Sequence, residues 1–375
     1  METKRKSSVI RRLYRLCPAA HWIALLSAGL ILLHLLTRHD HALMNAVSTR
    51  LIRPLHARLA LLFSALPFSV AELLFAAVIL AVLVYITLSL LRIIRREHKL
   101  HTLYRLTVRL TAAALGIYAG YCMMWGVYFY GDDFASRSGF ARREISVEEL
   151  ECVTRFFASR MNEYGALVTR DEHGLYAADR DAILARSDRV YEKTEQRYPC
   201  LAGPSVRVKG MLFSRIMSYL DYTGFFFPFT AEANVNTDFP LPQFAATVAH
   251  ELSHQRGVAK EEEANFVAVL ACLDTDDPDF LYSGCVSAFV YLGNALYDAD
   301  YAAWESVMDT LELPVVLDLA YDNAYWDSVD TPINEVSNGI YDGFLQSYGQ
   351  ELGVRSYGAC VDLLVAHYLP EARGE

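Results

Sequence analysis

The chain has 375 residues, of which 53% are hydrophobic, with a mean hydropathy of +0.18 and a formal net charge of −10. Residues 1–130 hold 16 Lys and Arg against 4 Asp and Glu, whereas residues 131–375 hold 18 against 40. Such an acidic C-terminal part excludes electrostatic binding of nucleic acid. The mean hydropathy is high for a soluble enzyme, and the excess of apolar residues lies in the first third of the chain.

Three long apolar runs in the first third carry no Lys, Arg, Asp or Glu, at 18–37, 73–91 and 111–131. Each is close to the roughly 20 residues that a helix needs to cross the hydrocarbon core of a bilayer. The pattern predicts a membrane domain over 1–130 with three transmembrane helices, at about 18–37, 70–91 and 110–130. The lipid bilayer is thus an expected partner.

Basic residues at the ends of these runs predict the orientation of the spans. They precede the first run and lie between the second and third, at Lys4, Arg5, Lys6, Arg11, Arg12, Arg15, Arg92, Arg95, Arg96, Lys99, Arg105 and Arg109. Because Lys and Arg are enriched on the cytoplasmic side, we expect a multi-pass protein of the cell membrane with a cytoplasmic N-terminus and an extracytoplasmic C-terminal domain. The segment 38–69 is expected to be either an amphipathic helix on the outer surface or a re-entrant segment.

Beyond the third run, residues 131–145 read as a polar linker and residues 146–375 as one domain. Ser146 followed by Glu149 predicts a capped helix start, and a second helix is expected at about 179–197. Alternating or aromatic stretches predict short strands at 204–209, 224–229 and 233–236, although the Phe-rich stretch could equally be core. The fold class expected is α+β and mainly α-helical, with a small β-sheet.

The sequence H-E-L-S-H at 250–254 is the most informative motif of the chain. Two histidines four residues apart on a helix project from one face, so that His250 and His254 can bind one Zn²⁺. Glu251 between them can act as the general base of a hydrolase. Gly257 is expected to end the helix and to reverse the chain.

A catalytic zinc site needs a third protein ligand, which the glutamates at the start of the next helix can supply. Glu261 is the favoured ligand because Glu261-Glu262-Glu263-Ala264-Asn265 matches an E-x-x-A-[D/N] pattern. Asn265 would then support the ligands by a hydrogen bond. Glu263 is the second choice for the ligand and Glu262 the third.

Such a site predicts hydrolysis of a peptide bond, with water activated by the metal and Glu251. A further donor should stabilise the negatively charged oxygen that forms, and Tyr357, Tyr222 and Arg215 are candidates. The expected partner is therefore a peptide or protein substrate.

The motif residues resemble an uncharacterised bacterial membrane-protein family, a domain of unknown function with about three N-terminal spans and a C-terminal H-E-L-x-H-Q-x-G-x-x-x-E-x-E-A-N-F motif. Here the motif covers 250–257 and 261–266, and the segment 224–236 and Ser356-Tyr357-Gly358 are also similar. The resemblance implies a zincin-like, gluzincin-type zinc metallopeptidase domain. The E-x-x-A-N element differs from the commoner E-x-x-A-D of gluzincins at Asn265.

Two other functions are compatible with the motif. The chain could be a non-catalytic membrane receptor or scaffold with a structural or lost zinc site, which would usually show four protein ligands. An intramembrane protease is disfavoured because Arg256 and Glu261–Glu263 follow the histidines directly, so no uncharged run of about 20 residues surrounds them.

Overall fold

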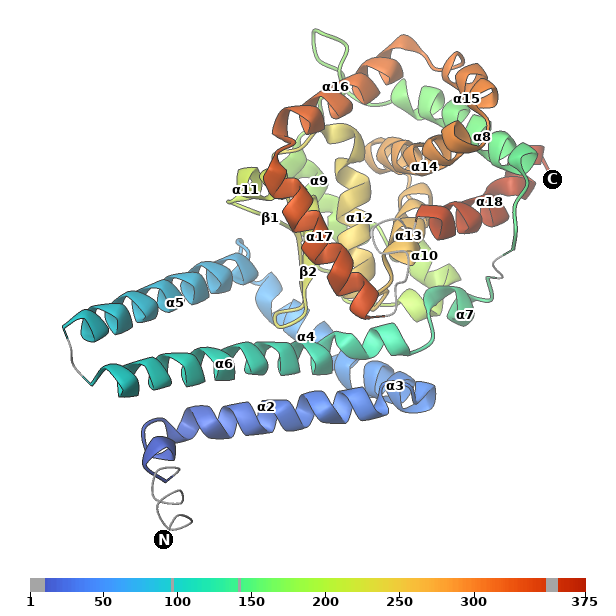
Figure 1. Cartoon of the computed structure of the whole chain (residues 1–375). Coiled ribbons are helices and arrows are strands. Elements are labelled where there is room, and N and C mark those ends of the chain that lie inside the picture. Colours follow the sequence, from blue (N-terminus) through green and yellow to red (C-terminus); the bar gives the residue numbers. More distant parts are fainter. Residues whose placement is uncertain (1–10, 96–97, 141–142, 349–356) are drawn as a thin grey trace. The chain divides into compact units, whose positions relative to one another are not determined.

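The computed structural model describes residues 11–95, 98–140, 143–348 and 357–375, and the side chains of 357–359 lie outside that description. The fold is mainly helical with one small sheet (Figure 1). Contacts divide the chain into two compact units. Unit 1 comprises residues 1–52 and 71–131, and unit 2 comprises residues 53–70 and 132–375.

Unit 1 is built from three long apolar helices and shorter connecting turns. The long helices are α2 (Pro18–Thr37), α5 (Val70–Ile94) and α6 (Lys99–Met124); the shorter elements are α3 (His41–Val47), a π-helical turn (Ser48–Ile52) and a 3₁₀ turn (Gly126–Tyr130). Helices α2 and α6 pack side by side (Figure 1) through a small cluster of Cys17, Ala20 and Ala112. Small residues at this contact allow the two backbones to approach closely.

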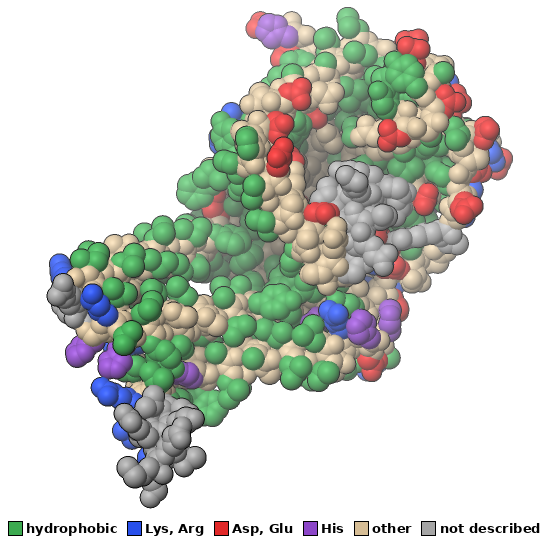
Figure 2. All heavy atoms as spheres, viewed as in Figure 1, with side chains coloured by type: hydrophobic (Ala, Val, Ile, Leu, Met, Phe, Trp, Pro, Cys, Tyr) green, Lys and Arg blue, Asp and Glu red, His purple; other side chains and the backbone are tan. Residues whose placement is uncertain are grey.

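The three long helices are long and apolar enough to cross a membrane, and their hydrophobic side chains remain exposed (Figure 2). They indicate a membrane protein and match the three runs predicted from the sequence. The third helix differs in its bounds, because it begins at Lys99 rather than near 110 and ends at Met124. The aromatic residues 128–130, expected at the end of this span, lie instead in the 3₁₀ turn that follows it.

Helix α14 (Pro278–Ala299) also meets the length and composition criterion for a span. However, 61% of its apolar window is buried inside the protein, against α8, α12, α13 and α18. The apolar residues of α14 are therefore accounted for by the core of unit 2.

Unit 2 surrounds α14 with helices. In chain order they are α4 (Arg53–Ser64), α7 (Phe134–Ser138), α8 (Val147–Gly165), α9 (Arg180–Arg186), α10 (Glu192–Arg197), α11 (Ser214–Tyr219), α12 (Phe244–Gln255), α13 (Glu261–Leu273), α14, α15 (Tyr301–Met308), α16 (Leu313–Val329), α17 (Pro332–Ser347) and α18 (Tyr357–Arg373), with 3₁₀ turns at Ser187–Arg189, Pro199–Leu201 and Leu241–Gln243. Helix α8 starts at the predicted capping box of Ser146 and Glu149. The single helix expected at 179–197 is instead broken into α9, a 3₁₀ turn and α10.

The sheet has three strands in the order β1-β3-β2, with β1 at Lys209–Gly210, β2 at Gly224–Phe227 and β3 at Glu232–Val235. β3 runs parallel to β1 and antiparallel to β2, so β2 lies at one edge. The strand expected at 204–209 is reduced to its last residue and Gly210. Asn234 is a buried residue of β3, within the strand expected at 233–236.

Residues 53–70 pack on this sheet, although the sequence grouped them with the membrane domain. Ser69 Oγ donates to Asn234 Oδ1 (2.6 Å), and the Val70 amide donates to Glu232 Oε1 (3.1 Å). Lys209 Nζ binds the same Glu232 oxygen (2.6 Å) and the carbonyls of Phe63 and Phe68. The helical segment foreseen within 38–69 thus includes α4, which these buried polar contacts fix to unit 2.

Candidate metal centre

Helix α12 carries the H-E-x-x-H motif and is held by a buried apolar face. Phe244, Ala245, Val248, Ala249 and Leu252 are each almost completely buried, at the spacing of one helix side. Pro242 lies in the 3₁₀ turn that leads into the helix. Because an apolar stripe this complete must face the core, the histidines are turned toward α13.

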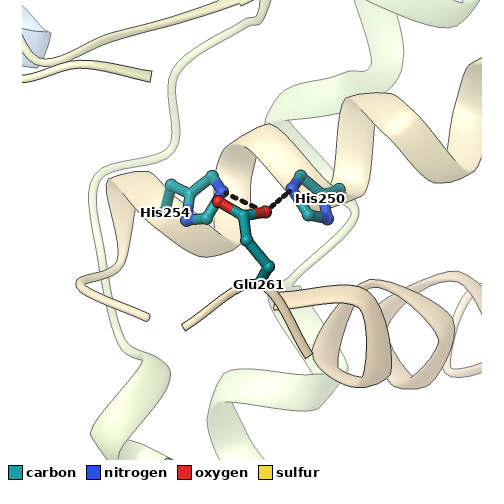
Figure 3. Close-up of side chains that lie close together, drawn as sticks. All are labelled: His250, His254 and Glu261. Carbon is teal, nitrogen blue, oxygen red and sulfur yellow. Dashed lines mark ion pairs between the residues drawn. The ribbon is translucent and has the colours of Figure 1, made fainter. Parts of the chain in front are cut away.

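Gly257 reverses the chain between α12 and α13, as the sequence predicts. Its φ of +85° lies in the left-handed region, which a glycine adopts without steric cost. The Gly257 amide donates to the His254 carbonyl (2.9 Å), and the Val258 amide donates to the Ser253 carbonyl (3.1 Å). This tight end allows α13 to begin only a few residues later, with Glu261 facing back toward α12 (Figure 3).

His250, His254 and Glu261 form a cluster whose ligand atoms all lie within 4.8 Å of one another. Glu261 Oε2 lies between the two imidazoles, 3.3 Å from His250 Nε2 and 3.6 Å from His254 Nε2 (Figure 3). The side chains are 17%, 8% and 21% exposed, respectively, so the cluster is shielded but still reaches the surface.

The imidazoles are oriented by neighbouring groups. His254 Nδ1 hydrogen-bonds the Val258 carbonyl (2.7 Å), which leaves Nε2 to face Glu261. The side chain of Asn265 hydrogen-bonds His250. Partners of this kind fix the tautomer and the ring plane of metal-binding histidines.

Burial and mutual attraction set the charges of the cluster. Burial lowers the pKa of His250, which keeps its lone pair available. Burial disfavours the charged form of Glu261, but the neighbouring His254 more than offsets this and holds the Glu261 pKa well below its usual value. Glu261 in turn outweighs burial and raises the pKa of His254 to about 9, so His254 is protonated in the metal-free cluster. Histidine binds metals as the neutral imidazole and glutamate as the carboxylate, so a metal would displace the proton of His254.

Glu251 lies near the cluster, since its charge interacts with those of His254 and Glu261. Its side chain is buried, and burial raises its pKa to about 8. Among the residues that the structure describes, Glu251 Oε2 has no hydrogen-bond partner. A buried carboxylate oxygen without a partner is costly, so such a group is a candidate for a functional role.

The edge strand β2 passes directly beside Glu251. A Cβ atom at Gly224, the first residue of β2, would lie 2.5 Å from Glu251 Oε1 and 2.8 Å from its Cγ and Cδ. Real Cβ atoms essentially never come this close, so any other residue at this position would force Glu251 or the strand to shift. The structure thus places an edge strand, where an extended peptide could pair, next to the candidate base.

The other two glutamates of α13 have different surroundings. Glu263 is buried and accepts hydrogen bonds from the amides of Phe134 (2.8 Å) and Ala135 (3.0 Å), which start α7. Glu262 is also buried but does not belong to the cluster of ligand atoms. Of the three candidates, only Glu261 is brought to the histidines.

Tyr341 is a site residue that the sequence did not single out. Its hydroxyl donates to Glu261 Oε1 (2.7 Å), the carboxylate oxygen that does not face the histidines. Tyr341 lies in α17, 80 residues after Glu261, and was one of many aromatic residues in a helical region. No local motif marks it.

The three residues predicted as oxyanion donors differ in their position relative to the cluster. The Tyr222 ring contacts the Tyr341 ring, with centroids 5.8 Å apart, so Tyr222 borders the cluster. Arg215, on α11, forms an ion pair with Asp238 (3.1 Å) and is not brought to the cluster. The side chain of Tyr357 lies outside the described residues.

Comparison with protein families places most of the chain in a family model. A family model described as a protein of unknown function (DUF3810) matches residues 48–365, a range that contains the whole cluster from α12 to Tyr341. No curated protein and no solved structure matches the chain.

Proposed function

This chain belongs to the DUF3810 family of proteins of unknown function, and we propose that it is a membrane-anchored, zinc-dependent metallopeptidase. The observation that carries the proposal is the His250, His254 and Glu261 cluster with Glu251 beside it. Two histidines and a glutamate are a standard ligand set of catalytic zinc, which leaves a position open for water and substrate.

The residues of the cluster fit a zinc ion. His250 and His254 would bind it through their imidazoles, and Glu261 through the oxygen that faces both rings. Tyr341 and Asn265 would hold Glu261 and His250 in place. A zinc ion held in this way supplies Lewis acidity and lowers the pKa of a bound water to about 7.

Glu251 would serve as general base and then as general acid. Its carboxylate accepts a proton from the attacking water and passes that proton to the amide nitrogen that leaves. The unpartnered oxygen Oε2 supports this role, because no other described residue competes for its lone pairs. An extended substrate could pair with β2, whose first residue, Gly224, leaves no room for a Cβ atom beside Glu251.

Metal content and hydrolysis, measured on the full-length protein in detergent, test the proposal. We expect about one zinc per chain in the wild type and in Glu251→Gln, but cleavage of a random peptide library by the wild type alone. His250→Ala should lose both, whereas the control His173→Ala, at an exposed histidine, should keep both. Absence of zinc from the wild type would refute the proposal, and zinc without hydrolysis would favour the receptor or scaffold with a structural site.

We also propose that the spans place the N-terminus in the cytoplasm and unit 2 outside it, from the basic residues at the span ends. Arg11, Arg12 and Arg15 precede α2, whereas Lys4, Arg5 and Lys6 lie outside the described residues. In a background with Cys152→Ser and Cys200→Ser, which removes the half-buried thiols, Leu167→Cys should react with an impermeant maleimide on intact cells. Arg95→Cys should react only after permeabilisation, and the reverse pattern would invert the topology.

A further inference from the structure

Several segments of unit 2 expose large apolar side chains, and two of them are joined by a nearly buried lysine. At the end of the 53–70 segment these are Leu62, Leu66 and Phe68, which are 65%, 38% and 40% exposed. Before and within α11 they are Leu212, Phe213 and Ile216, which are 79%, 54% and 57% exposed. Figure 2 shows hydrophobic side chains over α11. These six residues are called the apolar surface below.

The exposed residues of α11 lie on the side of the helix opposite the core. Ser214, Met217 and Ser218 are buried, whereas Ile216 and the preceding Leu212 and Phe213 point outward. Arg215, the charged residue of this helix, pairs with Asp238. Leu212, Phe213 and Ile216 thus form an exposed apolar group beside the half-exposed Arg215, and exposed apolar groups of this kind often mark an interaction.

Lys209 joins the two halves of the apolar surface. Its ammonium donates to the carbonyls of Phe63 (2.7 Å) and Phe68 (2.9 Å), and Leu212 follows only three residues later in the chain. Lys209 is nearly buried and also forms an ion pair with Glu232 (2.6 Å), so its side chain is held in one position, unlike that of an exposed lysine. The end of the 53–70 segment is therefore fastened to the residues that lead into α11.

The position of this surface along the chain bears on what it contacts. Helix α5, one of the apolar helices long enough to span a membrane, begins at Val70, two residues after Phe68. The amide of Val70 is itself bound to Glu232 in unit 2. The apolar surface therefore lies beside the start of this candidate span. Next to a membrane span, the hydrophobic effect favours burial of apolar side chains in the bilayer interface.

We propose that the apolar surface docks into the interface of the lipid bilayer, on the side of the membrane where unit 2 lies. The tether alone would leave unit 2 free to tumble above the bilayer. With α11 docked as well, unit 2 is held at two places, so that its sheet keeps one orientation to the lipid surface.

Docking would also bring the metal centre close to the membrane. Tyr222 follows α11 by three residues, contacts Tyr341, and through it reaches Glu261. Asn236 secures this turn by donating to Ser218 Oγ (2.9 Å) and to the Tyr222 carbonyl (3.0 Å). Resting on the proposed peptidase function, this geometry points to substrates whose cleaved bond lies at the bilayer surface, such as the juxtamembrane segment of an anchored protein.

Spin labels in lipid nanodiscs test the docking without any reference to hydrolysis. The full-length protein with Cys152→Ser and Cys200→Ser would carry a nitroxide at Leu212→Cys or Ile216→Cys, with Leu167→Cys and Leu313→Cys as controls of similar exposure. We expect the ratio of collisions with oxygen to collisions with a water-soluble nickel chelate to be several-fold higher at the two α11 positions. Equal ratios at all four positions would overturn the proposal. Spin–spin broadening at Ile216 that disappears on dilution with unlabelled protein would also overturn it, because a second copy would then be the occupant.

A second experiment addresses the substrate. Ile216→Glu should retain cleavage of a soluble peptide but lose at least tenfold in cleavage of the same peptide tethered to lipid, relative to wild type. Equal loss on both peptides, or on neither, would contradict a membrane-proximal substrate. If the wild type cleaves neither peptide, the peptidase proposal fails while the spin-label result still decides the docking.

Discussion

Replacing Gly224 by alanine tests whether β2 and Glu251 form one working unit. The added Cβ would lie 2.5 Å from Glu251 Oε1, closer than atoms can approach, so the carboxylate or the strand must move. Overpacking of a buried site typically costs about 1–3 kcal/mol, and displacing a reacting group by about 1 Å can lower the rate about 100-fold. We therefore expect a fall of about 100-fold in kcat/KM and a decrease of a few degrees in Tm, with zinc content unchanged.

The assay is peptide hydrolysis with parallel zinc analysis and thermal unfolding of the full-length protein in detergent. Gly343→Ala is the matched control, because a Cβ at Gly343 in α17 meets nothing within 4 Å. It should leave hydrolysis unchanged and stabilise the helix slightly. Glu251→Asp shortens the clashing side chain, so Gly224→Ala should lower Tm less in that background than in the wild type. Full hydrolysis by Gly224→Ala, or the same loss of Tm in both backgrounds, would refute the close approach.

Three further predictions concern other parts of unit 2. Tyr341→Phe removes the donor to Glu261 Oε1 and should weaken zinc binding about 10–100-fold, measured by competition with a chelator, whereas unchanged affinity would show that Tyr341 does not support the ligand. Glu263→Ala leaves two buried amides of α7 without acceptors and should lower the free energy of unfolding by about 2–4 kcal/mol. The variant should still bind one zinc per chain, and loss of zinc would instead make Glu263 a ligand. Burial lowers the pKa of His367 to about 4, below its unfolded value near 6.5, so the unfolded state binds the proton first and stability falls as the pH drops from about 6.5 to 4. His367→Phe should remove about 3 kcal/mol of this loss in unfolding free energy. The measurement is Tm against pH for the two proteins, and profiles of equal slope would show that His367 is not the cause.

Local patterns in the sequence were sufficient for the parts of the site that depend on helical spacing. His250 and His254 share a face because four residues make about one turn, and the left-handed turn at Gly257 follows from the only residue type that adopts it freely. The capping box at Ser146 and the three apolar runs in the first third are equally local, since each depends on neighbouring residues alone.

Other features depended on contacts between distant segments. Three consecutive glutamates have the same local chemistry, and only the direction of α13 relative to α12 brings Glu261 to the histidines while Glu263 reaches α7. Helix α14 is as apolar as a membrane span, and only its packing partners show that it forms a core.

The amino-acid sequence by itself determined the helix with its two histidines, the turn that follows and the apolar helices, because those features arise from side-chain spacing and backbone preference within a few residues. A sequence pattern favoured Glu261 among the three glutamates, but tertiary structure alone decided that Tyr341 holds it from 80 residues away and that residues 53–70 belong with the sheet. These choices depend on buried hydrogen bonds between segments far apart in the chain, and no local preference encodes such pairings.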